Sequence, residues 1–105
     1  MKGSFFQNIP EKIKKELFET IIETKNIKIE KIVSKGQSSP KNFWYDEKMS
    51  EFVLVLQGSA LLQFEKNSKT IYLKKGDYLN IEPHSRHRVL ATEKNIETLW
   101  LAVYY

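Results

Sequence analysis

The chain has 105 residues, no cysteine and a net charge of +4, with 17 lysine and arginine residues against 13 aspartate and glutamate residues. This length predicts a single domain with a small core, and the lack of cysteine excludes disulfides, thiolate metal sites and cysteine nucleophiles. No segment is long and apolar enough for a transmembrane helix, and the N-terminus has no signal-peptide core. We therefore expect a soluble, cytoplasmic protein.

The positive charge raises the hypothesis of nucleic-acid binding. All but two of the basic residues are lysines, however, and they are spread along the chain among glutamates. Arginine, whose planar fork suits phosphate and guanine, occurs only at Arg86 and Arg88. We interpret the lysines as a solvated surface, and nucleic-acid binding is the weaker hypothesis.

Residues 10–24 predict an amphipathic helix. Ile13, Leu17 and Ile21 recur at helical spacing with lysines and glutamates between them, and Pro10 suits a first helical turn. Because the polar face carries glutamates as well as lysines, we favour a helix packed on the domain over one lying on a membrane. We accordingly divide the chain into a helical segment, residues 1–26, and a barrel, residues 27–105.

From residue 27 the period of the apolar residues changes to two, which is typical of strands. Gly, Pro, Asn and Asp mark turns between short apolar segments. Many short strands at this spacing predict an all-β fold, an antiparallel barrel or jelly roll. The predicted strands cover residues 27–34, 43–46, 51–57, 60–65, 70–73, 78–81, 87–91 and 97–105.

Two motifs carry the chemistry of the chain. The first begins at Glu51, continues as an apolar strand and ends at Gly58. The second begins at the Gly76-Asp77 turn and ends with both histidines of the protein, His84 and His87. Carboxylate and imidazole are ligands for Mn, Fe, Ni or Zn, although Glu51 could instead pair with an arginine and His87 could bond a backbone carbonyl.

The spacing of these motifs resembles the two motifs of the cupin family, over about residues 27–105. Glu51 and Gly58 match the end of the first family motif, whereas Gly76 and His87 match the second. The chain also resembles a group of very short single-domain cupins, which is defined by fold and not by an assigned reaction. The resemblance implies an antiparallel barrel, a metal site in some members, and enzymes such as dioxygenases, isomerases and decarboxylases in others.

The chain departs from the family pattern at the His-x-His pair of the first motif, where Trp44 and Asp46 stand. If the motif positions keep their roles, the candidate metal ligands are His87, Glu51, Asp46 and, at the proline bend, His84. The resemblance thus leaves open whether a divalent metal binds. Trp44 is predicted to line the pocket and make it more apolar.

We expect the barrel to bind a small molecule in its cavity, with or without a divalent metal. The alternatives are a metal-free ligand sensor and a metal-dependent enzyme. We also expect His87 to point into the barrel beside Glu51. A homodimer is expected because small barrels leave sheet edges exposed and twofold dimers are the commonest assemblies.

Overall fold

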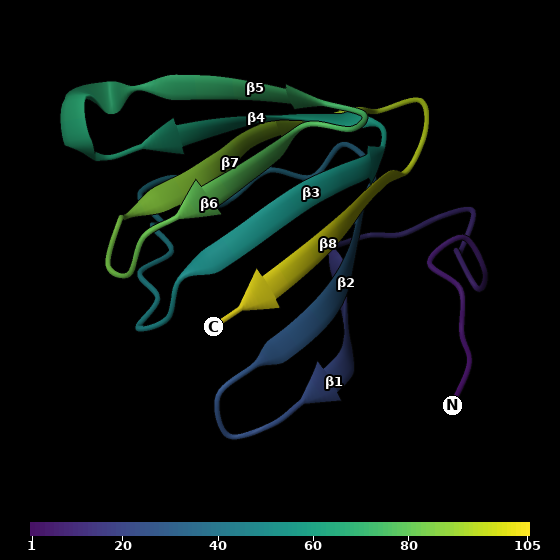
Figure 1. The fold of residues 1–105 in the computed structure, drawn as a ribbon. Helices are drawn as coiled ribbons and strands as arrows, with labels where there is room; N and C mark the ends of the chain where they lie inside the picture. The colour runs from purple at the N-terminus through teal and green to yellow at the C-terminus, as the bar shows by residue number, and fades with distance from the viewer.

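The computed structural model describes residues 1–105 as two antiparallel β-sheets that face each other (Figure 1). The larger sheet has the strand order β1-β2-β8-β3-β6, and the smaller has the order β5-β4-β7. This confirms the predicted all-β fold of barrel or jelly-roll type. The elements are β1 (Leu17–Glu23), β2 (Lys28–Ser34), β3 (Glu51–Gln57), β4 (Ser59–Phe64), the 3-10 turn η1 (Lys66–Ser68), β5 (Thr70–Lys74), β6 (Tyr78–Ile81), β7 (His87–Thr92) and β8 (Thr98–Tyr104).

Seven of the eight predicted strands are present, and the bounds of β3 and β6 agree with the prediction. The strand expected at 43–46 is wrong. Those residues form a loop that makes one isolated bridge, between Tyr45 and His87. The structure contains no helix with the length and apolarity needed to cross a bilayer.

The helix predicted for residues 10–24 is also wrong. Its second half is strand β1, which pairs with β2 and has a register shift between Thr20 and Ile22. The β-branched residues Thr20, Ile21 and Ile22 favour an extended chain, and pairing with β2 satisfies backbone groups that a helix would have satisfied internally. The apolar spacing fits both an amphipathic helix and this edge strand.

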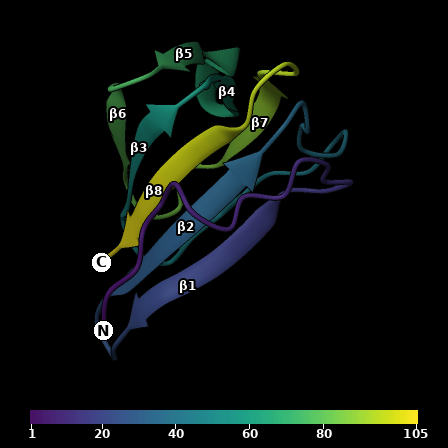
Figure 2. The same ribbon diagram turned by 90° about the vertical axis from the view of Figure 1, so that its right-hand side faces the viewer.

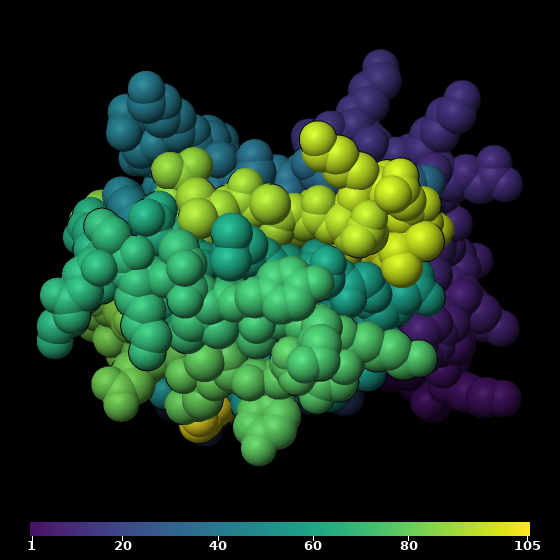
Figure 3. Space-filling view, turned by 90° about the horizontal axis from the view of Figure 1, so that it is seen from above, coloured from purple at the N-terminus to yellow at the C-terminus, as the bar shows by residue number.

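The residues before β1 cross the outer face of the larger sheet (Figure 2). Three side chains in or just after β2 donate hydrogen bonds to backbone carbonyls of this N-terminal segment. Lys31 Nζ donates to the carbonyl of Gln7 at 2.8 Å, and two further side chains donate to the carbonyls of Glu11 and Ile13. Lys31 is therefore only 4% exposed. Figure 3 shows the N-terminal residues gathered along one side of the molecule.

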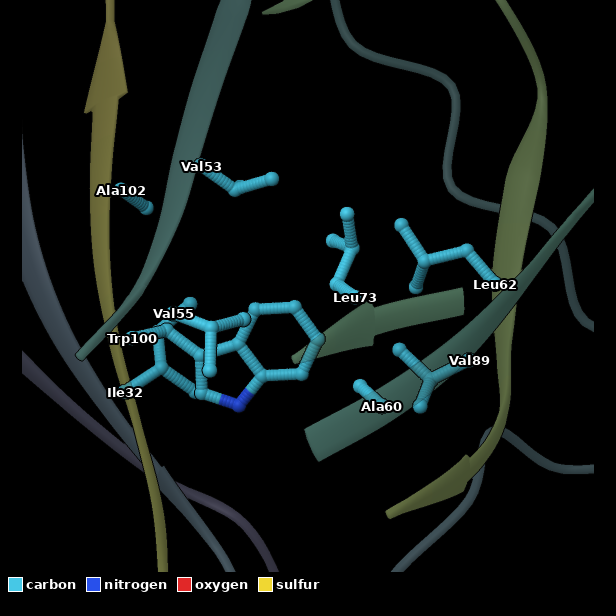
Figure 4. Close-up of a cluster of buried hydrophobic side chains, with 9 residues drawn as sticks. All are labelled: Ile32, Val53, Val55, Ala60, Leu62, Leu73, Val89, Trp100 and Ala102. Atoms are coloured by element: carbon cyan, nitrogen blue, oxygen red, sulfur yellow. The ribbon is translucent and has the colours of Figure 1, made fainter. Parts of the chain in front are cut away.

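The core lies between the two sheets. The indole of Trp100 projects from β8 across the space toward side chains of the smaller sheet (Figure 4). Its Nε1 donates to Ser34 Oγ at 3.1 Å, so the buried polar atom is satisfied. Nine buried residues form the cluster: Ile32, Val53, Val55, Ala60, Leu62, Leu73, Val89, Trp100 and Ala102.

Gly58 makes the turn from β3 in the larger sheet to β4 in the smaller one. Its φ is +83°, and a Cβ at this position would lie 2.3 Å from the hydroxyl oxygen of Thr98. The same hydroxyl accepts from the Ser59 amide and donates to the Ser59 carbonyl. Gly58 is required here both by conformation and by the close approach of β8.

Replacing Leu99 by alanine should lower the free energy of unfolding by about 2–5 kcal/mol, because the side chain is fully buried and leaves a cavity. Urea unfolding followed by circular dichroism measures this change. Leu101→Ala is the matched control, since Leu101 lies two residues along the same strand but is only half-buried. Equal losses for the two variants would contradict the prediction.

We propose that the protein forms a homodimer, as expected from its exposed edges. Strand β1 is an edge of the larger sheet, and large apolar side chains near both edges are exposed, including Ile22 (44%) and Tyr78 (69%). Sedimentation velocity at micromolar concentration should show a species of about twice the 12.4 kDa chain mass. A single 12.4 kDa species would refute the dimer.

Candidate functional site: a cavity between the sheets

A cavity of about 440 Å³, measured out to its open mouth, lies between the sheets. Nine of its twelve lining residues are hydrophobic, and the remaining three are Glu16, Glu51 and His87. The hydrophobic residues are Phe18, Ile32, Tyr45, Val53, Leu62, Ile81, Val89, Trp100 and Tyr104.

Glu51 and His87 face each other in this cavity, as predicted. Glu51 begins β3 in the larger sheet, and His87 begins β7 in the smaller. His87 Nε2 lies 3.3 Å from Glu51 Oε1, and the two residues are 4% and 8% exposed. Hence one buried polar pair links the two sheets.

The hydrogen bonds of His87 indicate its protonation state. Nδ1 lies 2.8 Å from the carbonyl oxygen of Ser85, which can only accept. Nδ1 therefore carries a proton, and Nε2 needs a second proton to donate to the Glu51 carboxylate. An imidazolium that faces a carboxylate satisfies both contacts.

Electrostatics in the cavity agree with this assignment. Burial lowers the pKa of His87, but the hydrogen bond to Glu51, the Ser85 carbonyl and the charges of Glu51 and Glu47 together raise it above its ordinary value of 6.5. Burial and the charges of four glutamates raise the pKa of Tyr45 to about 12, and burial and glutamate charges also raise the pKa of Tyr104. Both phenols stay protonated at neutral pH, and the glutamates near them make the cavity negatively charged.

Aromatic rings fix the orientation of the imidazole. The Tyr45 ring stacks on His87 with a centroid distance of 5.6 Å, and Phe64 lies 5.8 Å away on a neighbouring strand. The backbones of Tyr45 and His87 exchange two hydrogen bonds, of 2.7 and 3.1 Å. The loop that contains Tyr45 thus contacts the imidazole ring of His87 and also pairs with the backbone of β7.

The four predicted metal ligands form two separate pairs. Glu51 contacts His87 inside the cavity, whereas Asp46 Oδ1 lies 2.7 Å from His84 Nδ1 at the surface, where the two side chains are 42% and 66% exposed. No three His, Cys, Asp or Glu residues come together in a group that could hold a metal ion. One carboxylate and one imidazolium do not fit the three or four ligands of a usual protein site, and a protonated imidazole cannot ligate.

The prediction for Trp44 is wrong, because Tyr45 and not Trp44 lines the cavity. The guanidinium of Arg88 lies 5.9 Å from the centroid of the Trp44 ring, and it also donates to the Ser39 carbonyl. The alternative in which Glu51 pairs with an arginine is not found either, since Arg86 pairs with Glu65. The alternative carbonyl bond of His87 is present, alongside Glu51.

Sequence analysis predicted only Glu51 and His87 among the lining residues; those that it missed include Glu16, Phe18 and Tyr104. Glu16 and Phe18 fall in the segment predicted as a helix, where no sequence signal distinguishes cavity residues. Burial raises the pKa of Glu16, and its hydrogen bond from Ser34 lowers it by less. The alternation of β8 places Tyr104 on the same face as Trp100 and Ala102, so its position could have been derived.

Protonation of His87 should stabilise the fold in a pH-dependent manner. Because folding raises the pKa of His87, its contribution to stability is fully present below the unfolded value and is lost as the pH rises through the folded value. Urea unfolding of the wild type and of His87→Gln, from about pH 5.5 to about pH 9, should show a wild-type advantage that shrinks as the pH rises.

Glu51→Gln removes the charge that raises the pKa and is the control for this experiment. The stability difference between Glu51→Gln and a Glu51→Gln/His87→Gln double variant should depend much less on pH. A difference between wild type and His87→Gln that stays constant across the pH range would show that His87 is not an imidazolium in the fold.

The chain is similar to several solved structures, whereas no curated protein matches it. A putative mannose-6-phosphate isomerase from Ralstonia eutropha JMP134 is 39% identical, with 99% of this chain and 96% of that chain covered and a TM-score of 0.94. A cupin superfamily protein from Desulfitobacterium hafniense DCB-2 is 20% identical, with 91% and 82% covered and a TM-score of 0.74.

A third similar protein, HppE, has been crystallised in Fe(II) and Co(II) forms. The Co(II) form is 18% identical, with 93% of this chain and 57% of that chain covered and a TM-score of 0.72. At this identity the likeness shows the fold alone. The family model described as a cupin domain matches residues 30–104, and the chain therefore belongs to the cupin family.

Proposed function

We propose that the protein binds a small, mainly apolar molecule in its barrel cavity, with the Glu51–His87 pair as the polar end of the site and no metal between them. The observation that carries this proposal is a buried pair of charged side chains in a cavity with mostly hydrophobic walls. Binding sites of this kind combine apolar walls with a few polar groups that fix the orientation of the ligand.

The Glu51–His87 pair offers a ligand one hydrogen-bond acceptor, the Glu51 carboxylate. Both ring nitrogens of His87 are used by Ser85 and Glu51, so the imidazolium has no proton left to donate. Oε1 of the Glu51 carboxylate contacts His87, whereas no protein group donates to Oε2. A hydroxyl or amino group of the ligand is therefore the natural partner of Glu51.

A second candidate function comes from the similar Ralstonia protein, which is described as a putative mannose-6-phosphate isomerase. Isomerisation of a phosphosugar would need a site for a phosphate dianion. Phosphate sites use arginine, lysine or backbone N–H groups, but no lysine or arginine lines this cavity and two glutamates do. The charge of the cavity thus favours the first function.

A library of small neutral, cationic and anionic fragments should contain binders that shift the amide resonances of cavity residues in ¹⁵N–¹H NMR spectra. Glu51→Gln should weaken the hits that bear a hydroxyl or amino group about tenfold or more, because it removes a charged hydrogen-bond acceptor. Asp46→Asn is the matched control: it neutralises the other carboxylate–histidine pair, which lies outside the cavity, and should leave the affinities unchanged.

Elemental analysis distinguishes the proposed metal-free site from a site that binds a metal ion. Protein purified without a chelator or a histidine tag should contain no stoichiometric Mn, Fe, Ni or Zn by elemental analysis, and EDTA should not change fragment binding. Mannose 6-phosphate should not shift the cavity resonances. One equivalent of metal that is lost in His87→Ala would overturn the metal-free proposal and support a metal-dependent function.

A further inference from the structure

Glu16 supplies a second carboxylate to the cavity, from outside the residues 30–104 that match the cupin family. It lies at the end of a chain of hydrogen bonds. Trp100 Nε1 donates to Ser34 Oγ at 3.1 Å, and the Ser34 hydroxyl donates to Glu16 Oε2. Ser34 is fully buried and Trp100 is 4% exposed, so the core fixes the position of this carboxylate.

The chain of bonds leaves half of the carboxylate without a partner. Ser34 has one proton and gives it to Oε2, and no protein group donates to Oε1 of Glu16. Glu16 is partly buried, and this burial raises the pKa of its carboxyl group. A partly buried carboxylate with a single hydrogen bond gains free energy when a ligand supplies a further donor or a positive charge.

No cation of the protein fills this role. The chain has 17 lysine and arginine residues, yet none of them lines the cavity. The only basic side chain in the lining, His87, already contacts Glu51. The cavity of this basic protein is therefore acidic.

The walls of the cavity also suit a positive charge. Four of the lining residues are aromatic, namely Phe18, Tyr45, Trp100 and Tyr104. The faces of aromatic rings attract cations, and most strongly where water is excluded. A carboxylate combined with aromatic walls distinguishes an ammonium group from a neutral or anionic group of the same size.

We infer that the ligand carries an ammonium group on a short apolar body, and that Glu16 is the residue that determines this specificity. The inference rests on the proposed binding of a small molecule in the cavity. Glu16 Oε1 and the aromatic faces receive the ammonium group, and the aliphatic walls of the barrel pack around the body of the ligand.

Three probes of nearly equal shape test the inference on the full-length protein: butylammonium, 1-butanol and butyrate. Titrations followed by ¹⁵N–¹H NMR should show butylammonium shifting cavity resonances with an affinity at least about tenfold above that of 1-butanol. Butyrate should be the weakest of the three. This comparison uses the unmodified protein, so it does not depend on the folding of any variant.

Glu16→Gln should remove the preference for butylammonium, since it keeps the shape of the side chain and an oxygen for Ser34 but loses the charge. Glu19→Gln is the matched control: Glu19 is an exposed residue of β1 outside the cavity lining, and this variant should keep the preference. Equal melting temperatures of the two variants would show that both are folded.

The outcomes separate the inference from the proposed function. Binding of 1-butanol as tight as that of butylammonium, or a preference that survives in Glu16→Gln, would overturn the inference and leave the cavity as a binding site for neutral molecules. If none of the three probes shifted cavity resonances, the inference and the proposed function would both fail.

Discussion

The buried contact between Glu51 and His87 is the interaction on which the arrangement of the barrel depends. It joins the first residue of β3 in one sheet to the first residue of β7 in the other. Both charges are buried, so loss of one partner would leave the other uncompensated, which is far more destabilising than loss of an exposed ion pair. Replacement of only one of the two residues by an apolar side chain would leave the other as an unpaired buried charge. Both residues line the cavity, and Trp100 joins this cavity to the hydrophobic core.

The loop from Ser39 to Tyr45 holds this contact in place and also covers a sheet edge. Strand β7 is at the edge of the smaller sheet, where unpaired backbone groups would otherwise be exposed. The Ser39 amide donates to the Val89 carbonyl at 2.8 Å, and its hydroxyl accepts from the Val89 amide. Tyr45 and His87 then exchange two backbone hydrogen bonds. An irregular loop thus supplies both the missing edge partner and one wall of the cavity.

The barrel strands and the Glu51–His87 pair could be predicted because their signals are local and consistent. A continuous apolar segment that ends at the Gly58 turn specifies β3, and a short apolar segment after the Gly76-Asp77 turn specifies β6, without reference to the rest of the chain. Motif spacing then brings Glu51 and His87 together. The inclusion of both residues in one cavity follows from the topology of the two sheets.

Glu16 and Tyr45 could not be placed in the site, nor Asp46 at the surface, for physical reasons that differ from residue to residue. The segment with Glu16 has apolar spacing that fits a helix, and only pairing with β2 makes its second half a strand. Tyr45 replaces Trp44 in the cavity because residues 43–46 form no regular strand, so alternation gives no direction for their side chains. Asp46 lies on the same loop, and its direction toward His84 depends on the turn at His84, where φ is +62°.

The position of β1 at the sheet edge has a consequence for how the cavity exchanges its contents. β1 has β2 as its only neighbour in the sheet, and Phe18 at the cavity is 52% exposed. Edge elements with few buried contacts open locally at a much lower free energy than the whole domain unfolds. Local opening of β1 and the residues before it would take Glu16 and Phe18 away from the cavity together. A molecule that contacts both residues binds only the docked form, and by linkage it must slow hydrogen exchange along β1. The free energy with which the N-terminal strand docks on β2 therefore forms part of the affinity for any ligand that contacts both residues.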